Sequence, residues 1–325
     1  MTAGVRRVFK RFFVGCIAVV FSFTQLSSSV FALDGKFDEV FYNKNDVLGY
    51  NPSLACSTSQ GNIGPSNGSL TIPSYTNAVI KNDDHPDPGV IVGGDGELHM
   101  YTSGLRHFSS KDGVNWKGLK EADVKNAPGG ANTGAWAPDI AKVNDMYVLS
   151  WANPSGTIYY AIGDSAGGPF TYSGKLANEG IDPQIFADGG KYYLYYAGIN
   201  QIKVAELTIH GNNIKAGNAK SVLNRDMATE DWTVEAPWVF NRNGTYYMLY
   251  STGKWDGGGG FDRDKYDLRV AKASSPTQKF TRKGGAILRQ TSGKFTGPGT
   301  AAIISDKNGN DWLYYHARPN GGNDR

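Results

Sequence analysis

The sequence has few cysteines, no long apolar run and no helical periodicity. Only two cysteines occur among its 325 residues, Cys16 and Cys56, which excludes a disulfide-stapled scaffold. Apolar residues recur nowhere with the 3.6-residue period of a helix over three turns, which argues against a helical bundle. Glycine, with 42 residues, and aromatic side chains, at 12% of the chain, are abundant. This composition is typical of an all-β protein with many turns.

The first 32 residues have the three parts of a secretory signal peptide. Four basic residues lie within residues 6–11, an apolar stretch follows over residues 14–23, and residues 30–32 (VFA) are a suitable cleavage site. The apolar stretch is too short for a membrane span. We therefore expect a protein secreted into the extracellular space or the periplasm, with no membrane attachment after cleavage. The alternative is a retained anchor.

The excess of positive charge does not extend beyond this segment. The chain has 33 basic and 30 acidic residues, and residues 1–32 hold four of the basic residues and none of the acidic ones. The mature protein would be close to neutral, without the Lys/Arg stripe of a nucleic-acid-binding surface. Cys16 leaves with the signal, so Cys56 would have no intrachain partner. We expect a monomer that binds no nucleic acid and folds without disulfides.

One pattern recurs five times along the chain: a proline, a short apolar strand, a polar turn and a strand that is mostly rich in tyrosine. The five prolines, roughly 45 to 60 residues apart, are Pro88, Pro138, Pro183, Pro237 and Pro298. This spacing is the period of a four-stranded propeller blade. The sequence therefore predicts an all-β, five-bladed β-propeller with its active site at one end of the central axis.

Three of the repeats carry a carboxylate beside the proline. Asp87 and Asp182 directly precede it, and Glu235 lies one residue further back. Because a residue before proline is pushed into extended geometry, we expect these side chains to project from strand starts at one end of the propeller. A turn-marking role would explain one Asp-Pro pair but not acids in three repeats. Asp139 follows its proline, so we expect it to be structural or to support the residues of the site from behind, capping a turn beside Trp136.

Several stretches, in shared order and spacing over about residues 83–317, resemble glycoside hydrolase family 43. They are HPDPGVIV from His85, SSKDGVNW from Ser109, WAPDIAKVNDMYVLSWA from Trp136, IDPQIFADGGKYYLYYA from Ile181, EAPWVFNRNGTYYMLYS from Glu235, YDLRVAKASSPTQKF from Tyr266 and GPGTAAIISDKNGNDWLYYHA from Gly297. The resemblance implies a five-bladed propeller acting on arabinose- and xylose-containing polysaccharides of the plant cell wall. Residues 81–325 would be the catalytic domain, and residues 33–80 an N-terminal extension leading into the first blade.

The resemblance also implies inverting hydrolysis, with a division of roles among the acids. Asp87 would be the general base that activates water, and Glu235 the general acid that protonates the leaving sugar oxygen. Asp182 would orient Glu235 and keep its pKa high. Inversion needs the acid and the base on opposite faces of the sugar, about 6.5–9.5 Å apart, which different blades can hold rigidly. The expected substrate has α-L-arabinofuranosidic linkages, as in arabinan or arabinose-decorated polysaccharides.

No cofactor is expected to be required. By resemblance, His316 would lie beside an axial structural calcium or water cluster; the alternative is a hydrogen-bonded core histidine. Because calcium prefers oxygen ligands, such a metal would be held through waters. Trp136, Trp238 and Trp255 are candidates for stacking on sugar faces.

The fifth repeat departs from the family pattern. Residues 300–302 (TAA) stand where the family often has a His-Asn or His-Ser pair, and the chain stops nine residues after His316. The fifth blade would then be incomplete. Either residues 69–80 supply closing strands, or the sequence is a fragment with an open sheet edge.

Three other functions remain open from the sequence. The first is a β-xylosidase acting on xylo-oligosaccharides. The second is a propeller hydrolase of the fructan-cleaving type, which retains configuration, although the Arg that those enzymes place before Asp-Pro is missing at Ile181. The third is a non-catalytic carbohydrate-binding propeller.

Overall fold

The computed structural model describes residues 16–18, 79–80, 85–118, 120–127, 134–255, 266–288, 290–291, 295–305 and 311–319. All regular secondary structure in these segments is β-strand or an isolated β-bridge. No helix that could cross a membrane is found in them. The all-β prediction is therefore confirmed for the described residues.

The described strands form five sheets. Listed with their bounds, the first two sheets are β2 (Gly89–Val92), β3 (Leu98–Thr102), β4 (Arg106–Ser110) and β5 (Lys117–Gly118), then β7 (Trp136–Val143), β8 (Met146–Ala152), β9 (Ile158–Gly163), β10 (Phe170–Ala177) and β6 (Val124–Lys125). The next two are β11 (Ile181–Asp188), β12 (Lys191–Gly198), β13 (Gln201–His210), β14 (Asn213–Ala216) and β15 (Lys220–Asn224), then β16 (Val234–Arg242), β17 (Thr245–Thr252), β18 (Asp267–Ala273) and β19 (Thr281–Arg282). The last is β1 (Cys16–Ala18), β22 (Asp311–Pro319), β21 (Phe295–Ser305) and β20 (Gln290–Thr291).

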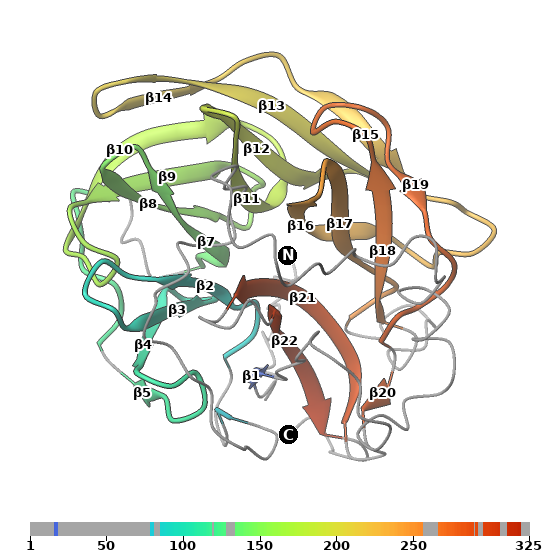
Figure 1. Cartoon of the computed structure of the whole chain (residues 1–325), viewed down its shortest axis with the longest axis horizontal. Coiled ribbons are helices and arrows are strands. Elements are labelled where there is room, and N and C mark those ends of the chain that lie inside the picture. Colours follow the sequence, from blue (N-terminus) through green and yellow to red (C-terminus); the bar gives the residue numbers. More distant parts are fainter. Residues whose placement is uncertain are drawn as a thin grey trace, which may run out of the picture.

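The sheets are arranged as a propeller (Figure 1). Strands β2, β7, β11, β16 and β21 lie nearest the middle, and each of them contacts the next. Strand β21 also contacts β2, which closes the ring between the last sheet and the first. The prediction of a propeller is therefore confirmed.

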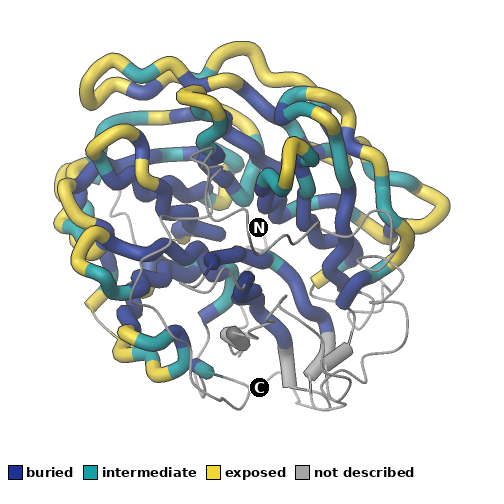
Figure 2. Tube along the Cα trace, viewed as in Figure 1, coloured by how far each residue is buried: buried dark blue, intermediate teal, exposed yellow. Residues whose placement is uncertain are grey.

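The hydrophobic core lies between neighbouring sheets (Figure 2). Strand β12 shows how the Tyr-rich repeats fill it. Tyr193 and Tyr195 belong to the cluster shared with the fourth sheet, whereas Leu194 and Tyr196 belong to the cluster shared with the second. Successive side chains of a strand point to opposite faces, so the alternation serves two buried faces. Burying a leucine such as Leu194 contributes about 1.5–3 kcal/mol.

The last sheet differs from the others in how its outer side is covered. Among the described residues, the strand beyond β22 is the three-residue β1, which pairs antiparallel with it, Cys16 opposite His316. This strand falls within the predicted signal peptide, which stays a prediction. Of residues 69–80, predicted as a source of closing strands, only 79–80 are described; Ile80 packs in the core beside Val90 and Leu98.

Candidate active site

Every innermost strand has a β-bulge near its start. In β16, for example, Glu235 pairs with Ser251 and Trp238 with Leu249, so two residues face one partner residue between them. The same register shift follows Trp136 in β7, Ile181 in β11 and Gly299 in β21. In the first sheet, the N–H of Ser103 donates to the carbonyl of Pro86, which places the same irregularity at Asp87.

The first residue of each bulge has a left-handed backbone. The φ angles are 62° at Asp87, 41° at Ala137, 54° at Asp182, 51° at Ala236 and 41° at Thr300. The expectation that proline forces extended geometry on Asp87 and Asp182 is therefore wrong. The bulge overrides it, because the strand bends and twists at the inserted residue. Positive φ costs roughly 1–3 kcal/mol for a residue with a side chain, and aspartate tolerates it better than most.

The bulges also correct the alignment of the fifth repeat. Thr300 holds the position that Asp87 and Asp182 hold in their sheets, and Ala301 the position of the proline that follows them. Pro298 lies three residues too early to be the equivalent proline. The fifth recurrence of the proline pattern is therefore a coincidence of spacing, although the strand itself is equivalent.

The bulges surround a pocket on the propeller axis. It is lined by residues of all five sheets, among them Pro88, Ala137, Asp182, Ala236 and Thr300. The structure thus brings together the strand starts that the sequence placed at one end.

Asp87 is surrounded by hydrogen-bond donors. Its Oδ2 accepts from Ser103 Oγ at 2.6 Å, and its Oδ1 accepts from Thr300 Oγ1 at 2.9 Å. His316 Nδ1 lies 3.1 Å from Oδ1 and 3.3 Å from the Asp87 backbone N. When protonated, Nδ1 donates to the carboxylate, and otherwise it accepts from the N–H. Burial raises the pKa of Asp87, but His316, Ser103 and Thr300 outweigh it and lower the pKa below its ordinary value.

Glu235 has the opposite surroundings. Its Oε1 accepts a hydrogen bond from the Tyr266 hydroxyl at 2.8 Å. Burial and the charge of Asp87 raise its pKa to about 7, against the effect of Tyr266. Asp87, Asp182 and Glu235 are each half-buried as whole residues.

Asp182 is joined to Glu235 through the backbone. Its Oδ2 accepts from the N–H of Ala236, the residue directly after Glu235, at 3.0 Å. Burial, then the charges of Glu235 and Asp87, raise the pKa of Asp182 well above its ordinary value. The carboxyl therefore fixes the peptide that carries Glu235 and interacts electrostatically with both other acids.

Tyr266 and His316 link the two halves of the site. Their rings stack with centroids 6.0 Å apart and planes 9° from parallel, so the partner of Glu235 packs on the partner of Asp87. Gly299 is required beside them, because a Cβ there would lie 2.1 Å from Tyr266 Cε1. Sequence reasoning gave no role to Tyr266, Ser103 or Thr300. The one sequence signal was the matching YDLRVAKA stretch for Tyr266, whereas Thr300 is recognised only from its bulge position in the structure.

Asp139 is structural, but it does not cap a turn beside Trp136. It is 2% exposed, and its Oδ2 accepts from the N–H of Ile185 in the next sheet at 2.8 Å. Gln184, one sheet further, binds Val239 in the same way, with its Oε1 accepting from the N–H at 2.6 Å and its Nε2 donating to the carbonyl at 3.0 Å. Burial raises the pKa of Asp139 to about 7, against the hydrogen bonds from backbone N–H groups.

Trp238 occupies the equivalent position in the fourth sheet and is buried, at 8% exposure, in the core with Phe240 and Leu249. Trp238 also lines the axial pocket, and its role in stacking on a sugar stays a prediction. Trp136 and Trp255 are 42% and 45% exposed. Trp136 holds the position equivalent to Glu235, and Trp255 follows the end of β17, which pairs with the start of β16.

The arrangement provides one carboxyl group that favours the ionised form and another that favours the protonated form near neutral pH. Groups whose pKa values are pushed apart in one site can act as base and acid in the same reaction. Among the described residues, no three His, Cys, Asp or Glu side chains form a group that could hold a metal ion directly. His316 instead contacts Asp87.

Comparison with known proteins agrees with this geometry. The profile of glycosyl hydrolases family 43 matches residues 75–325. A probable arabinan endo-1,5-alpha-L-arabinosidase A of Aspergillus flavus is 28% identical over 263 residues, covering 71% of this chain and 81% of the relative. Beta-D-galactofuranosidase xynD of Aspergillus niger is 27% identical over 233 residues, 65% of each chain.

A solved structure, the alpha-L-arabinanase of Cellvibrio cellulosa, shares the fold with a TM-score of 0.60 at 21% identity, covering 73% of this chain and 87% of that one. The family match excludes the alternatives of a fructan-cleaving type of hydrolase and of a non-catalytic carbohydrate-binding propeller. With its acids gathered around the axis of a propeller, the chain belongs to glycosyl hydrolases family 43 and is a glycoside hydrolase.

Proposed function

We propose that this protein is an exported, inverting hydrolase of α-L-arabinofuranosidic linkages in arabinan or arabinose-decorated plant polysaccharides. The observation that carries the proposal is the opposite perturbation of two carboxyl groups in one site. The pKa of Asp87 is lowered, chiefly by His316 acting against burial, and the pKa of Glu235 is raised to about 7 by burial and the charge of Asp87.

In this mechanism, Asp87 is the general base. Its ionised carboxylate takes a proton from a water molecule as the oxygen of that water attacks the anomeric carbon. The donors of Ser103, Thr300 and His316 keep the carboxylate ionised and fix its orientation. A base with a low pKa is weak, but it is fully in its active form over the whole neutral range.

Glu235 is the general acid. Its proton passes to the glycosidic oxygen as the bond from that oxygen to the anomeric carbon breaks, and the leaving sugar departs as an alcohol. Tyr266 donates to Oε1, which leaves Oε2 to carry the transferable proton. Asp182 holds the Ala236 N–H, so it orients Glu235, and its own negative charge when ionised opposes the ionisation of Glu235.

The choice of arabinan is supported by relatives that are named as arabinan endo-1,5-alpha-L-arabinosidases and by the arabinanase with the same fold. Two further parts of the proposal follow from the sequence and the ring of sheets. The five sheets are five blades, and residues 1–32 direct export. A water-mediated calcium near His316 remains a prediction of the family resemblance.

The experiment compares hydrolysis of an aryl α-L-arabinofuranoside, an aryl β-D-xyloside and debranched arabinan, with product configuration read by NMR. We expect arabinoside cleavage with inversion. Preference for the xyloside would replace the substrate by xylo-oligosaccharides, and net retention would refute the mechanism.

Two variants test the assigned roles. Asp87→Asn should abolish hydrolysis of every substrate, because no base remains. Glu235→Gln should lose least on a dinitrophenyl glycoside and most on arabinan, because a good leaving group needs no proton. Glu206→Gln, an exposed carboxylate paired with Lys191 at 3.0 Å, is the matched control and should behave as wild type.

A further inference from the structure

The loop of residues 225–233, between β15 and β16, carries a half-exposed aromatic side chain shortly before the acid Glu235 in the sequence. Trp232 is 50% exposed and precedes Glu235 by three residues. Three extended residues span at most about 11 Å, so the backbone of Trp232 lies close to that of the acid. Lys254 Nζ lies 4.6 Å from the centroid of the indole ring. This places a large, half-exposed indole at the acid end of the fourth sheet.

The backbone of Trp232 is held in a strained conformation. Its φ is 62°, which is a rare, costly conformation for a bulky residue. Arg225 Nη1 donates to the Trp232 carbonyl at 2.5 Å, and the neighbouring Asp231 carbonyl accepts from the N–H of Gly253 at 2.9 Å. Such strain persists only when surrounding contacts fix the residue in place.

The loop is also held by Glu230, two residues before Trp232. Its carboxylate is buried and accepts from the Asp226 N–H at 2.7 Å, from the Tyr250 hydroxyl at 2.7 Å and from Arg282 at 2.6 and 2.7 Å. Arg269 contributes a longer ion pair of 4.0 Å. Burial raises the pKa of Glu230, but Arg282, Asp226 and Tyr250 outweigh it and lower the pKa below its ordinary value.

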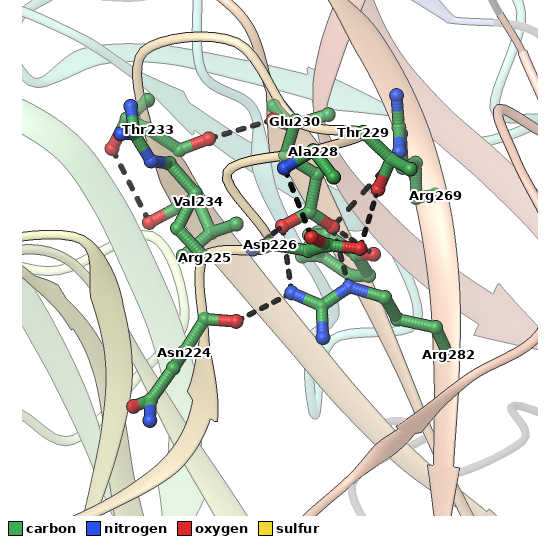
Figure 3. Close-up of polar contacts among 12 residues, drawn as sticks. Asn224, Arg225, Asp226, Ala228, Thr229, Glu230, Thr233, Val234, Arg269 and Arg282 are labelled. Carbon is green, nitrogen blue, oxygen red and sulfur yellow. Dashed lines mark hydrogen bonds and ion pairs between the residues drawn. The ribbon is translucent and has the colours of Figure 1, made fainter.

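Arg282 connects both ends of the loop (Figure 3). Its guanidinium donates to the carbonyl of Asn224, directly before the loop, and to the carboxylate of Glu230 near the end of the loop. Within the loop, Asp226 O accepts from the Glu230 N–H at 2.8 Å, reciprocating the bond from Asp226 N to Glu230. The loop is therefore closed by a two-point clamp on Arg282.

A buried ion pair is a poor means of stabilising a fold, because desolvation consumes most of its attraction. The same pair is well suited to fixing one loop geometry, because a displaced loop would leave the buried Glu230 carboxylate without its partly buried partner Arg282. The loop that this arrangement fixes carries Trp232.

We propose that Trp232 is a sugar-contacting residue on the leaving-group side of Glu235, and that Glu230 and Arg282 are positioning residues that hold it there. The inference rests on the proposed function, because the sugar that departs with the oxygen protonated by Glu235 must lie beside this acid. Its ligand is a pentose ring of an oligosaccharide, stacked by its C–H face on the indole. The contact with Trp232 should therefore affect the KM of a substrate that has a sugar as its leaving group more than the KM of one that has an aryl group.

The test measures KM and kcat of Trp232→Ala on an arabino-oligosaccharide and on an aryl arabinofuranoside. Stacking of this kind contributes about 3- to 10-fold in affinity, so the variant should raise KM for the oligosaccharide by that factor more than KM for the aryl substrate. Met227→Ala, 81% exposed in the same loop, is the matched control and should leave both values unchanged.

Glu230→Gln tests the positioning role. It should produce the same oligosaccharide-selective rise in KM, and the double variant with Trp232→Ala should be no worse than the more impaired single variant. Additive losses, or equal losses on both substrates, would overturn the positioning role. An unchanged oligosaccharide KM in Trp232→Ala would overturn the sugar contact.

The outcome for the proposed function is separate. If wild type cleaves xylo-oligosaccharides rather than arabinosides, the proposed substrate is wrong. The same comparison is then made between a xylo-oligosaccharide and an aryl xyloside, with the same expected selectivity.

Discussion

Replacing Glu235 by glutamine should make the protein more stable above neutral pH while impairing its activity. The pKa of Glu235 is raised to about 7 from the ordinary 4.5. Between these values the native state binds more protons than the unfolded state, so stability falls as the pH rises through this window. Glutamine has no proton to lose, and it keeps the Oε1 acceptor for Tyr266.

The magnitude follows from the two pKa values. Each unit of pKa difference corresponds to about 1.4 kcal/mol, so the raised pKa of Glu235 lowers the free energy of unfolding by about 3 kcal/mol at pH 8 and by about 1 kcal/mol at pH 5. Because the side chain is half-buried, solvent reduces the effect. We expect the stability advantage of the variant to grow by about 1–2 kcal/mol between these pH values. Asp182 adds to the gain, because its own carboxyl loses a negatively charged neighbour.

The assay is urea unfolding of both proteins at pH 5 and pH 8, fitted with a common m-value. Glu206→Gln serves as the matched control, since its carboxylate is 52% exposed and should change stability by less than about 1 kcal/mol at either pH. A difference between variant and wild type that is the same at pH 5 and pH 8 would refute the raised pKa of Glu235, and with it the assignment of the acid.

Three further predictions concern the same site. First, kcat/KM of the wild type should fall as the pH rises through about 7, where Glu235 loses its proton. It should stay high down to the ordinary pKa range of an aspartate, because the pKa of Asp87 is lowered. Initial rates from pH 3 to 9 that stay level above pH 8 would contradict the roles of the two acids. Second, Thr300→Val removes a hydrogen-bond donor to Asp87 Oδ1. Because a hydrogen bond to a charged group contributes about 1.5–3 kcal/mol, the acidic limb of the pH profile of kcat/KM should move to higher pH. An unmoved limb would exclude Thr300 as a residue that lowers the pKa of Asp87. Third, Gly299→Ala places a Cβ 2.1 Å from Tyr266 Cε1. It should lower both the activity and the free energy of unfolding, the latter by about 1–3 kcal/mol. Gly285→Ala is its control, because a Cβ at Gly285 would meet no atom within 4 Å.

The strands, the propeller and the meeting of Asp87, Asp182 and Glu235 could be predicted from the sequence because they depend on local patterns. Alternation along residues 191–196 identifies a strand whatever its neighbours are. The backbone of Asp87 could not be predicted, because the bulge is a property of the register with the paired strand. The donors to Asp87 were also missed, since Thr300 is 213 residues away in the sequence.

The tryptophans show the same limit. Trp136 and Trp238 both lie within two residues of a repeat proline, and nothing local separates them. The bulge does: Trp136 lies before it and is 42% exposed, whereas Trp238 lies after it and is 8% exposed. A shift of position across the bulge therefore changes how far a tryptophan side chain is exposed.

The left-handed bulge belongs to the fold rather than to the chemistry. It occurs at Ala137, Ala236 and Thr300, which have no acid, as well as at Asp87 and Asp182. Equivalent backbone positions therefore give two aspartates with opposite properties. Donors surround Asp87 and lower its pKa, whereas burial and the charges of Glu235 and Asp87 raise that of Asp182.

The difference between the two aspartates arises in the neighbouring sheets. Thr300 and His316 of the last sheet reach Asp87, and the fourth sheet places Glu235 and the Ala236 N–H beside Asp182. The repeated strand start thus fixes where a carboxyl group is held, and the sheet beside it determines whether that carboxyl favours the ionised or the protonated form. Removing the donor at Thr300 should therefore raise the pKa of Asp87 without displacing its carboxyl group. For this reason we expect the acidic limb of the pH profile, rather than the fold, to respond.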